Sequence, residues 1–152
     1  MRDSTNIKAR KQADDLTLAI YEQPRGFPRE ELSCLASQLR RAADSVPSNI
    51  AEGSSRKSKR DYLHFLHFAR GSLSEAQCFL HLAPRLGYLS DENAERLSAQ
   101  TKSTFAGLHG LIKAVAGEVG KFGGMTAAVT SVLVSCLCSR SPWSTQQWPV
   151  VL

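Results

Sequence analysis

Four basic residues within five positions are the strongest chemical signal in this sequence, which reads Arg56-Lys57-Ser58-Lys59-Arg60 at that point. Lysine and arginine attract phosphate groups by charge, and arginine can hold a phosphate through two parallel hydrogen bonds. Residues 40–70 contain seven Lys or Arg against three acids. The candidate contacts for a nucleic acid, either RNA or DNA, are Arg40, Arg41, Arg56, Lys57, Lys59 and Arg60.

The same basic cluster has a plainer interpretation as a solvated surface loop. Asp44 and Glu52 lie close by in the sequence, and an arginine paired with either acid is less available to a phosphate. The formal net charge of +5 fits an anionic partner, but net charge bears on association and solubility rather than on fold. Both interpretations stay open at the level of sequence.

Motifs of the common enzyme classes are missing from the sequence. It contains no P-loop, no G-x-G-x-x-G, no G-x-S-x-G and no H-E-x-x-H. His64 and His67 lie three residues apart, with His81 and His109 further along, but no third metal ligand is evident beside them. We therefore expect exposed or interface histidines, and a protein that is not an enzyme and holds neither a metal nor a cofactor.

The four cysteines do not have the spacing of a zinc site. Cys34 and Cys78 are far apart within helical patterns, and Cys136 and Cys138 form an isolated C-x-C pair. We expect reduced, buried thiols in a cytoplasmic protein. The polar N-terminus lacks the apolar core of a secretory signal. No apolar run reaches the ~20 residues of a membrane-spanning helix, so no membrane contact is expected.

Apolar residues recur at helical spacing in four segments, which predicts an all-α protein. The expected helices cover residues 6–22, 27–53, 58–87 and 90–120. Their short connections favour an antiparallel up-down-up-down four-helix bundle, which we assign to residues 1–124. Residues 125–152 differ in kind because Arg140 is their only charged residue. We expect them to form an appended, poorly ordered C-terminal tail.

The chain between the second and third helices carries residues that bend, end and restart a helix. Pro47 cannot donate a hydrogen bond to the carbonyl four residues earlier, so we expect a kink there. Ser48 and Asn49 are expected to satisfy the freed backbone groups. Gly53 is predicted to end the helix in the left-handed conformation. Ser58 is predicted to cap the next helix.

The third helix carries two apolar faces, and Gly87 is predicted to end it. The first face predicts a core contact and comprises Tyr62, Phe65, Leu66, Ala69, Leu73, Ala76, Leu80 and Ala83. The second face comprises Phe68, Ser72, Phe79, Leu82 and Leu86. A lone bundle needs only one apolar face on a helix, so the second predicts a partner. The aromatic residues therefore indicate core or interface rather than base stacking, and we expect recognition of backbone and shape.

Several motifs resemble those of one known family of four-helix-bundle proteins. The longest is S-Q-L-R-R-A-A-D-S-V-P-S-N-I-A-E-G, at residues 37–53, and three shorter ones follow it in order. They are D-Y-L-H-F-L at residues 61–66, A-R-G-S-L-S-E at 69–75 and L-G-Y-L at 86–89. The family includes proteins encoded in intervening sequences of bacterial large-subunit ribosomal RNA genes. It also includes Avd, the accessory variability protein of diversity-generating retroelements.

The resemblance covers residues 6–120 and implies an antiparallel bundle that assembles as a ring-like homopentamer. For Avd-like members it implies a basic barrel that binds nucleic acid and a reverse transcriptase and assists cDNA synthesis. The alternative is an intervening-sequence protein acting as a protein-interaction scaffold. Asn49, Glu52 and Gly53 match the family signature, and we expect structural roles for them, with Glu52 pairing to an arginine. Pro84 and the tail depart from the family pattern.

Overall fold

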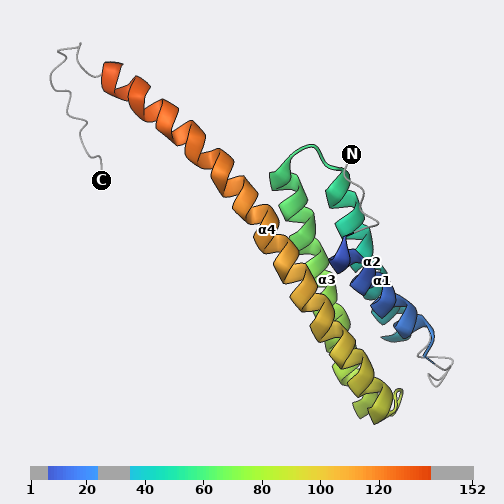
Figure 1. Cartoon of the computed structure of the whole chain (residues 1–152). Helices are drawn as coiled ribbons and strands as arrows, with labels where there is room; N and C mark the ends of the chain where they lie inside the picture. The colour runs from blue at the N-terminus through green and yellow to red at the C-terminus, as the bar shows by residue number, and fades with distance from the viewer. Residues whose placement is uncertain (1–6, 24–34, 138–152) are drawn as a thin grey trace, which may run out of the picture. The chain divides into compact units, whose positions relative to one another are not determined.

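Four helices follow one another along the chain (Figure 1). The computed structural model describes residues 7–23 and 35–137, with side-chain positions for residues 7–23 and 35–119. No strand occurs within these ranges, so the predicted all-α class is confirmed. The helices are α1 (Lys8–Tyr21), α2 (Leu35–Ser55), α3 (Lys59–Arg85) and α4 (Asp91–Leu137).

The helices alternate in direction, as an up-down-up-down bundle requires (Figure 1). Helix α2 packs along α3, and α1 packs along α2. Each helix contributes one apolar stripe to a shared core, whose most deeply buried large side chains include Leu16 of α1, Ile50 of α2, Leu66 and Leu73 of α3, and Leu108 of α4. The predicted four-helix bundle is confirmed, and helical periodicity alone accounts for which residues face its core.

Helix α4 extends beyond its predicted end near Gly120 and continues to Leu137. Gly123 and Gly124 follow the predicted end, but a helical glycine costs only about 1 kcal/mol relative to alanine. No proline follows before Leu137 to force an end. Contacts group the chain into Met1–Val119 and Gly120–Leu152.

Some of the residues on which the predictions fall are not described by the structure. The predicted start of the second helix at residue 27 lies outside them, as do residues 138–152 of the tail. The domain boundary at residue 124 and the poor order of the tail stay predictions. None of the described helices combines the length and the apolar character that a membrane-spanning helix needs.

Helix α2 continues through Pro47, and its freed carbonyl is satisfied from another helix. Pro47 has no backbone N–H, so it cannot donate to the Ala43 carbonyl four residues earlier. The Thr17 hydroxyl of α1 donates a hydrogen bond of 3.1 Å to that carbonyl instead. Ser48 and Asn49 were expected to help, but their side chains donate to the next two carbonyls, of residues 44 and 45, at 2.8 and 2.7 Å. The proline thereby ties α2 to α1, and the size of the predicted bend stays a prediction.

Gly53 does not end α2 in the left-handed conformation, and this prediction was wrong. The helix continues to Ser55, and Gly87 is the residue with positive φ, at 73°, among the described glycines. Gly87 follows Leu86, the C-cap residue of α3, as its predicted role requires. A Cβ atom added to Gly53 would lie 2.7 Å from the Phe65 Cβ and 2.8 Å from the Tyr62 ring. Gly53 is therefore required for the close approach of α2 and α3.

Replacing Gly53 with alanine is expected to lower the free energy of unfolding by about 1 to 3 kcal/mol, because the added methyl group overpacks the α2–α3 contact. Gly71→Ala is the matched control, since nothing lies within 4 Å of a Cβ atom at that helical position. The control should stabilise the protein by about 0.5 to 1 kcal/mol. Denaturant unfolding followed by circular dichroism measures both variants, and equal effects of the two would contradict the packing role of Gly53.

Replacing Thr17 with valine removes the hydroxyl donor while keeping the shape of the side chain. The unfolding free energy should fall by about 1 to 3 kcal/mol, because the Ala43 carbonyl loses its partner. In a Pro47→Ala background the restored backbone N–H can bond that carbonyl, so the cost of Thr17→Val should shrink. A double-mutant cycle measures this coupling, and identical costs in both backgrounds would show that the hydroxyl does not serve the proline.

Candidate nucleic-acid interface

The basic cluster lies at the corner between α2 and α3, where three residues connect the helices. Ser58 caps α3 as predicted, with its Oγ accepting hydrogen bonds from the backbone N–H groups of Arg60 at 3.1 Å and Asp61 at 3.4 Å. The cap fixes where α3 begins, so Lys59 and Arg60 occupy its first turn. The capping serine therefore positions the basic side chains around it.

Two of the four basic residues at the corner are held by acids. The Arg56 guanidinium pairs with Glu52 one turn earlier in α2, which confirms the predicted pairing of Glu52 with an arginine. The same guanidinium lies over the Phe65 ring, 4.7 Å from its centroid, in the geometry of a cation–π contact. Lys59 pairs with Glu118 of α4. Both cations are therefore partly neutralised within the subunit.

Lys57 and Arg60 differ from their neighbours. Both side chains are exposed, and neither has an ion pair with any residue that the structure describes. Their full donor sets, three N–H groups for lysine and five for arginine, remain available to a ligand. The free positive charge of the corner is thus concentrated in these two residues.

The structure does not bring Arg40 and Arg41 to the corner. Arg41 precedes Ser55, the last residue of α2, by fourteen residues, which is about 21 Å of helical rise. Arg40 lies over the Tyr21 ring of α1, 5.2 Å from its centroid, and Arg41 donates a hydrogen bond of 2.7 Å to the Gln38 side chain. Arg40 therefore serves the packing of α1 on α2, and the six predicted contacts fall into two separate groups.

Tyr21 links this second group to an acid. Its hydroxyl donates a hydrogen bond of 2.7 Å to the Asp44 carboxylate. That hydrogen bond, together with partial burial and the negative charge of Asp44, raises the pKa of Tyr21 above its usual value, while Arg40 acts in the opposite direction. The tyrosine therefore stays a neutral donor at physiological pH, and the α1–α2 contact keeps its hydrogen bond.

The histidines and the described cysteine lie on the surface. His64, His67, His81 and His109 are exposed, and no three potential metal ligands come together in the part of the chain with described side chains. Cys78 is also exposed, so the expected buried thiol was wrong at this position, because residue 78 falls between the buried positions 76 and 80 of α3. The side chains of the other three cysteines lie outside the described residues.

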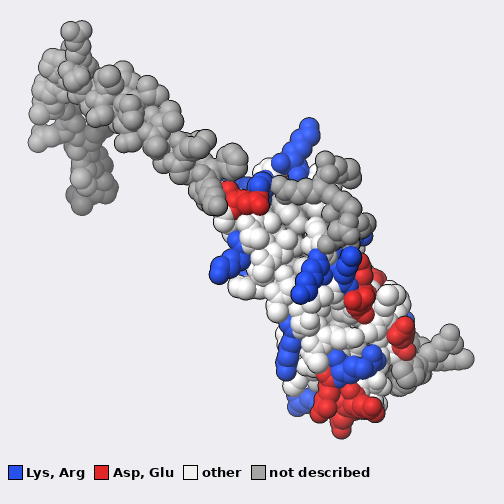
Figure 2. Space-filling model, viewed as in Figure 1, with Lys and Arg blue, Asp and Glu red and all other residues white. Residues whose placement is uncertain are grey.

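Charge is unevenly distributed on the face shown in Figure 2. A cluster of acidic side chains lies at the end where α4 begins, and Lys and Arg side chains are spread over the rest of this face and also border that cluster. Asp91 and Glu92 occupy the first turn of α4, where the positive end of the helix dipole favours them.

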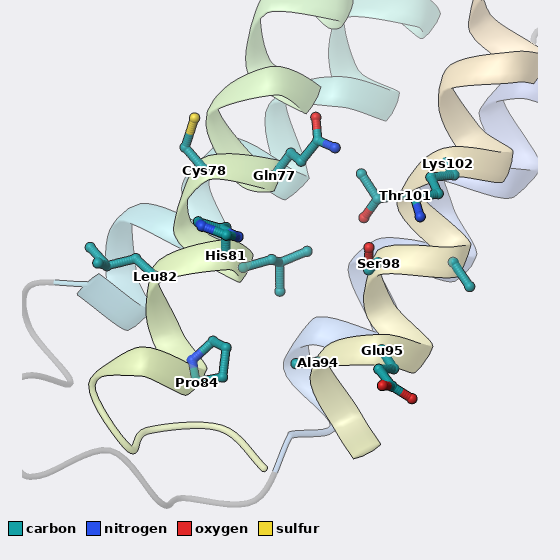
Figure 3. Close-up of a pocket in the computed structure, with 12 residues that line it drawn as sticks. Gln77, Cys78, His81, Leu82, Pro84, Ala94, Glu95, Ser98, Thr101 and Lys102 are labelled. Atoms are coloured by element: carbon teal, nitrogen blue, oxygen red, sulfur yellow. The ribbon is translucent and has the colours of Figure 1, made fainter. Parts of the chain in front are cut away.

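A groove of about 800 Å³ opens between α3 and α4, away from the corner. Its walls carry Gln77 and His81 from α3 and Ser98 and Thr101 from α4 (Figure 3). Leu82 also lines it and is 39% exposed. The predicted second apolar face of α3 thus does reach the surface, at Leu82 and at Leu86, which is 46% exposed.

The fold and the corner together define a class of protein, a basic four-helix bundle that displays free cations where its second and third helices meet. The sequence model of the 23S rRNA-intervening sequence protein family matches residues 5–110. The chain belongs to this family, as its sequence motifs predicted.

One solved structure supports the fold independently. It is the crystal structure of a protein of unknown function from the S23 ribosomal protein family of Bacteroides thetaiotaomicron. The two chains are 19% identical and superpose with a TM-score of 0.62, over 69% of this chain and 98% of the other. At this identity the likeness shows the fold alone. No curated protein matches the chain.

Proposed function

We propose that this protein is a non-enzymatic accessory protein that binds the phosphate backbone of RNA or DNA through its α2–α3 corner. The observation that carries the proposal is that Lys57 and Arg60 are exposed and have no acidic partner among the residues with described side chains, while Arg56 and Lys59 beside them are each paired to an acid. Exposed cations without a structural role bind phosphates by releasing counterions. Lys57 and Arg60 are the primary contacts, and Arg56 and Lys59 contribute less.

Assembly would raise the affinity for nucleic acid above that of a single subunit. Two phosphate contacts per subunit give little affinity at physiological salt, but a homopentamer repeats the corner five times and gains by avidity. The homopentamer is the assembly that the family resemblance implies. Exposed Leu82 and Leu86 beside the α3–α4 groove are the surface we assign to it.

The biological partner depends on the branch of the family. An Avd-like role places the protein beside a reverse transcriptase of a diversity-generating retroelement, whereas the name of the matching family points to ribosomal RNA intervening sequences. Genomic position separates the two branches. A neighbouring reverse transcriptase gene with template and variable repeats indicates the Avd-like role, and a position inside a ribosomal RNA gene indicates the other.

A protein-interaction scaffold is the second candidate function. It is favoured by the same exposed leucines, because apolar side chains of this size on a surface helix mark an interaction site when they are contiguous. A pull-down of protein partners that survives nuclease treatment supports this function. Loss of all partners after nuclease treatment supports the nucleic-acid proposal.

Replacing Lys57 and Arg60 together with alanine should weaken nucleic-acid binding and lower its salt dependence. Each lost phosphate contact removes about 0.7 from the slope of log K against log salt for a single strand, so the slope should fall by about 1.4. Fluorescence anisotropy across a salt series measures both quantities. Glu118→Gln is the matched variant of opposite sign, since it frees Lys59 and should strengthen binding. An unchanged slope in the double variant would remove the corner as the binding site.

Replacing Leu82 and Leu86 with aspartate should dissociate the assembly, because burying either carboxylate in an apolar interface is unfavourable. Sedimentation velocity of the full chain measures the mass of the complex. Ser74→Asp is the control, as residue 74 is also exposed on α3 but lies about 80° around the helix from Leu82. If the mass of the double variant equals that of the unmodified protein, these leucines do not form the interface.

A further inference from the structure

An exposed aromatic strip continues from the free cations along α3. Arg60, His64 and Phe68 follow one another at four-residue spacing, which places them on one face of the helix. Phe68 is 50% exposed. Its ring centroid lies 4.4 Å from that of His64 and 6.1 Å from that of Phe65, both in edge-to-face geometry. The strip therefore presents a guanidinium, an imidazole and a phenyl ring in sequence.

Phe68 is not one of the core positions of α3. The buried positions of α3 are 62, 66, 69, 73, 76, 80 and 83, and residue 68 is not among them. Phe65 is partly buried against the core, so its position follows from packing, but the exposed half of Phe68 gains nothing from the fold. The exposed ring lies on the same face of α3 as unpaired Arg60, about two helical turns away, so an extended ligand could contact both.

The sequence indicated core or interface roles for the aromatic residues, but Phe68 is 50% exposed. We infer that Arg60, His64 and Phe68 form a stacking platform for single-stranded nucleic acid, an inference that rests on the proposed function. Proteins that bind single strands without sequence preference combine cations along the backbone with aromatic rings on which bases stack. Here Lys57 and Arg60 supply the cations, Phe68 supplies the ring, and Arg56 above Phe65 extends the positive edge of the strip.

The chemistry favours a single strand over the two other occupants of such a surface. Bases in a duplex stack on one another and offer no free face to Phe68, whereas unpaired bases can be splayed onto a ring. A second copy of this chain would have to bring acidic side chains to Lys57 and Arg60, since burying these cations unpaired is costly. A single strand covers the ring with a base and neutralises both cations with its phosphates.

The test compares a 20-nucleotide poly-uridine RNA with an RNA duplex of the same length, using the full chain and fluorescence anisotropy. Phe68→Ala should weaken single-strand binding about tenfold, with little change in duplex binding and no change in the salt slope. Phe68→Tyr keeps the ring and should bind like the unmodified protein. Lys57 and Arg60 replaced together with alanine should weaken binding of both RNAs.

Four outcomes overturn parts of this scheme and can be told apart. Unchanged single-strand affinity in Phe68→Ala overturns the platform, and the proposed function survives if the cation variant still binds less. If the unmodified protein binds neither RNA, the proposed function falls as well. Equal loss for both RNAs in Phe68→Ala also overturns the platform. A changed mass of the Phe68→Ala assembly in sedimentation, with helicity intact by circular dichroism, assigns Phe68 to a subunit interface and overturns the platform.

Discussion

The close contact of α2 with α3 at Gly53 is the constraint on which the rest of the corner depends. Because Gly53 has no side chain, the Cβ of Phe65 and the ring of Tyr62 occupy the space beside it. Tyr62 is thereby buried in the core, and Phe65 is fixed where Arg56 can lie over its ring. A single missing methyl group thus connects the packing of two helices to the positions of a cation and an aromatic side chain.

Small polar side chains complement this apolar contact by fixing how the helices align. Thr17 bonds the carbonyl that Pro47 leaves free, and Ser45 and Ser72 share a hydrogen bond of 2.9 Å between α2 and α3. Thr104 of α4 donates at 3.3 Å to the backbone of α1 at Gln12. Apolar contacts hold two helices together but allow several alignments along the helix axis. A partly buried hydrogen bond is lost when one helix shifts by a residue, so it favours one alignment. These bonds hold the corner at one fixed place in the bundle.

Helical periodicity and capping chemistry were sufficient to predict the four helices, the core stripe and the start of α3 at Ser58, since all of these depend on local sequence. Gly53 was misassigned because a glycine near the end of a helix fits both a left-handed stop and a close approach, and only the neighbouring helix decides between them. The end of α4 was missed because two glycines weaken a helix without forbidding it.

The candidate site also divides into what local sequence predicts and what only the fold shows. Six cations looked equivalent in the sequence. Glu52 as a partner of an arginine could be predicted at i to i+4 spacing, but Glu118 as the partner of Lys59 required the fold, because 59 residues separate them. Arg40 and Arg41 were grouped with the corner because sequence distance does not show that about 21 Å of helix lies between Arg41 and the end of α2.

The partial neutralisation of the corner has a consequence for selectivity. Four unpaired cations in one short stretch would bind any polyanion tightly through counterion release alone, leaving little energy to distinguish one strand from another. With Arg56 and Lys59 paired to acids, the electrostatic contribution of each subunit to the proposed binding would be small, so such binding would depend more on contacts that are not purely ionic. An exposed ring such as Phe68 is such a contact, because stacking requires an accessible base and is far less sensitive to salt. In an assembly of several copies, weak charge and modest stacking at each corner add together, and the complex can favour extended single strands that reach several corners at once.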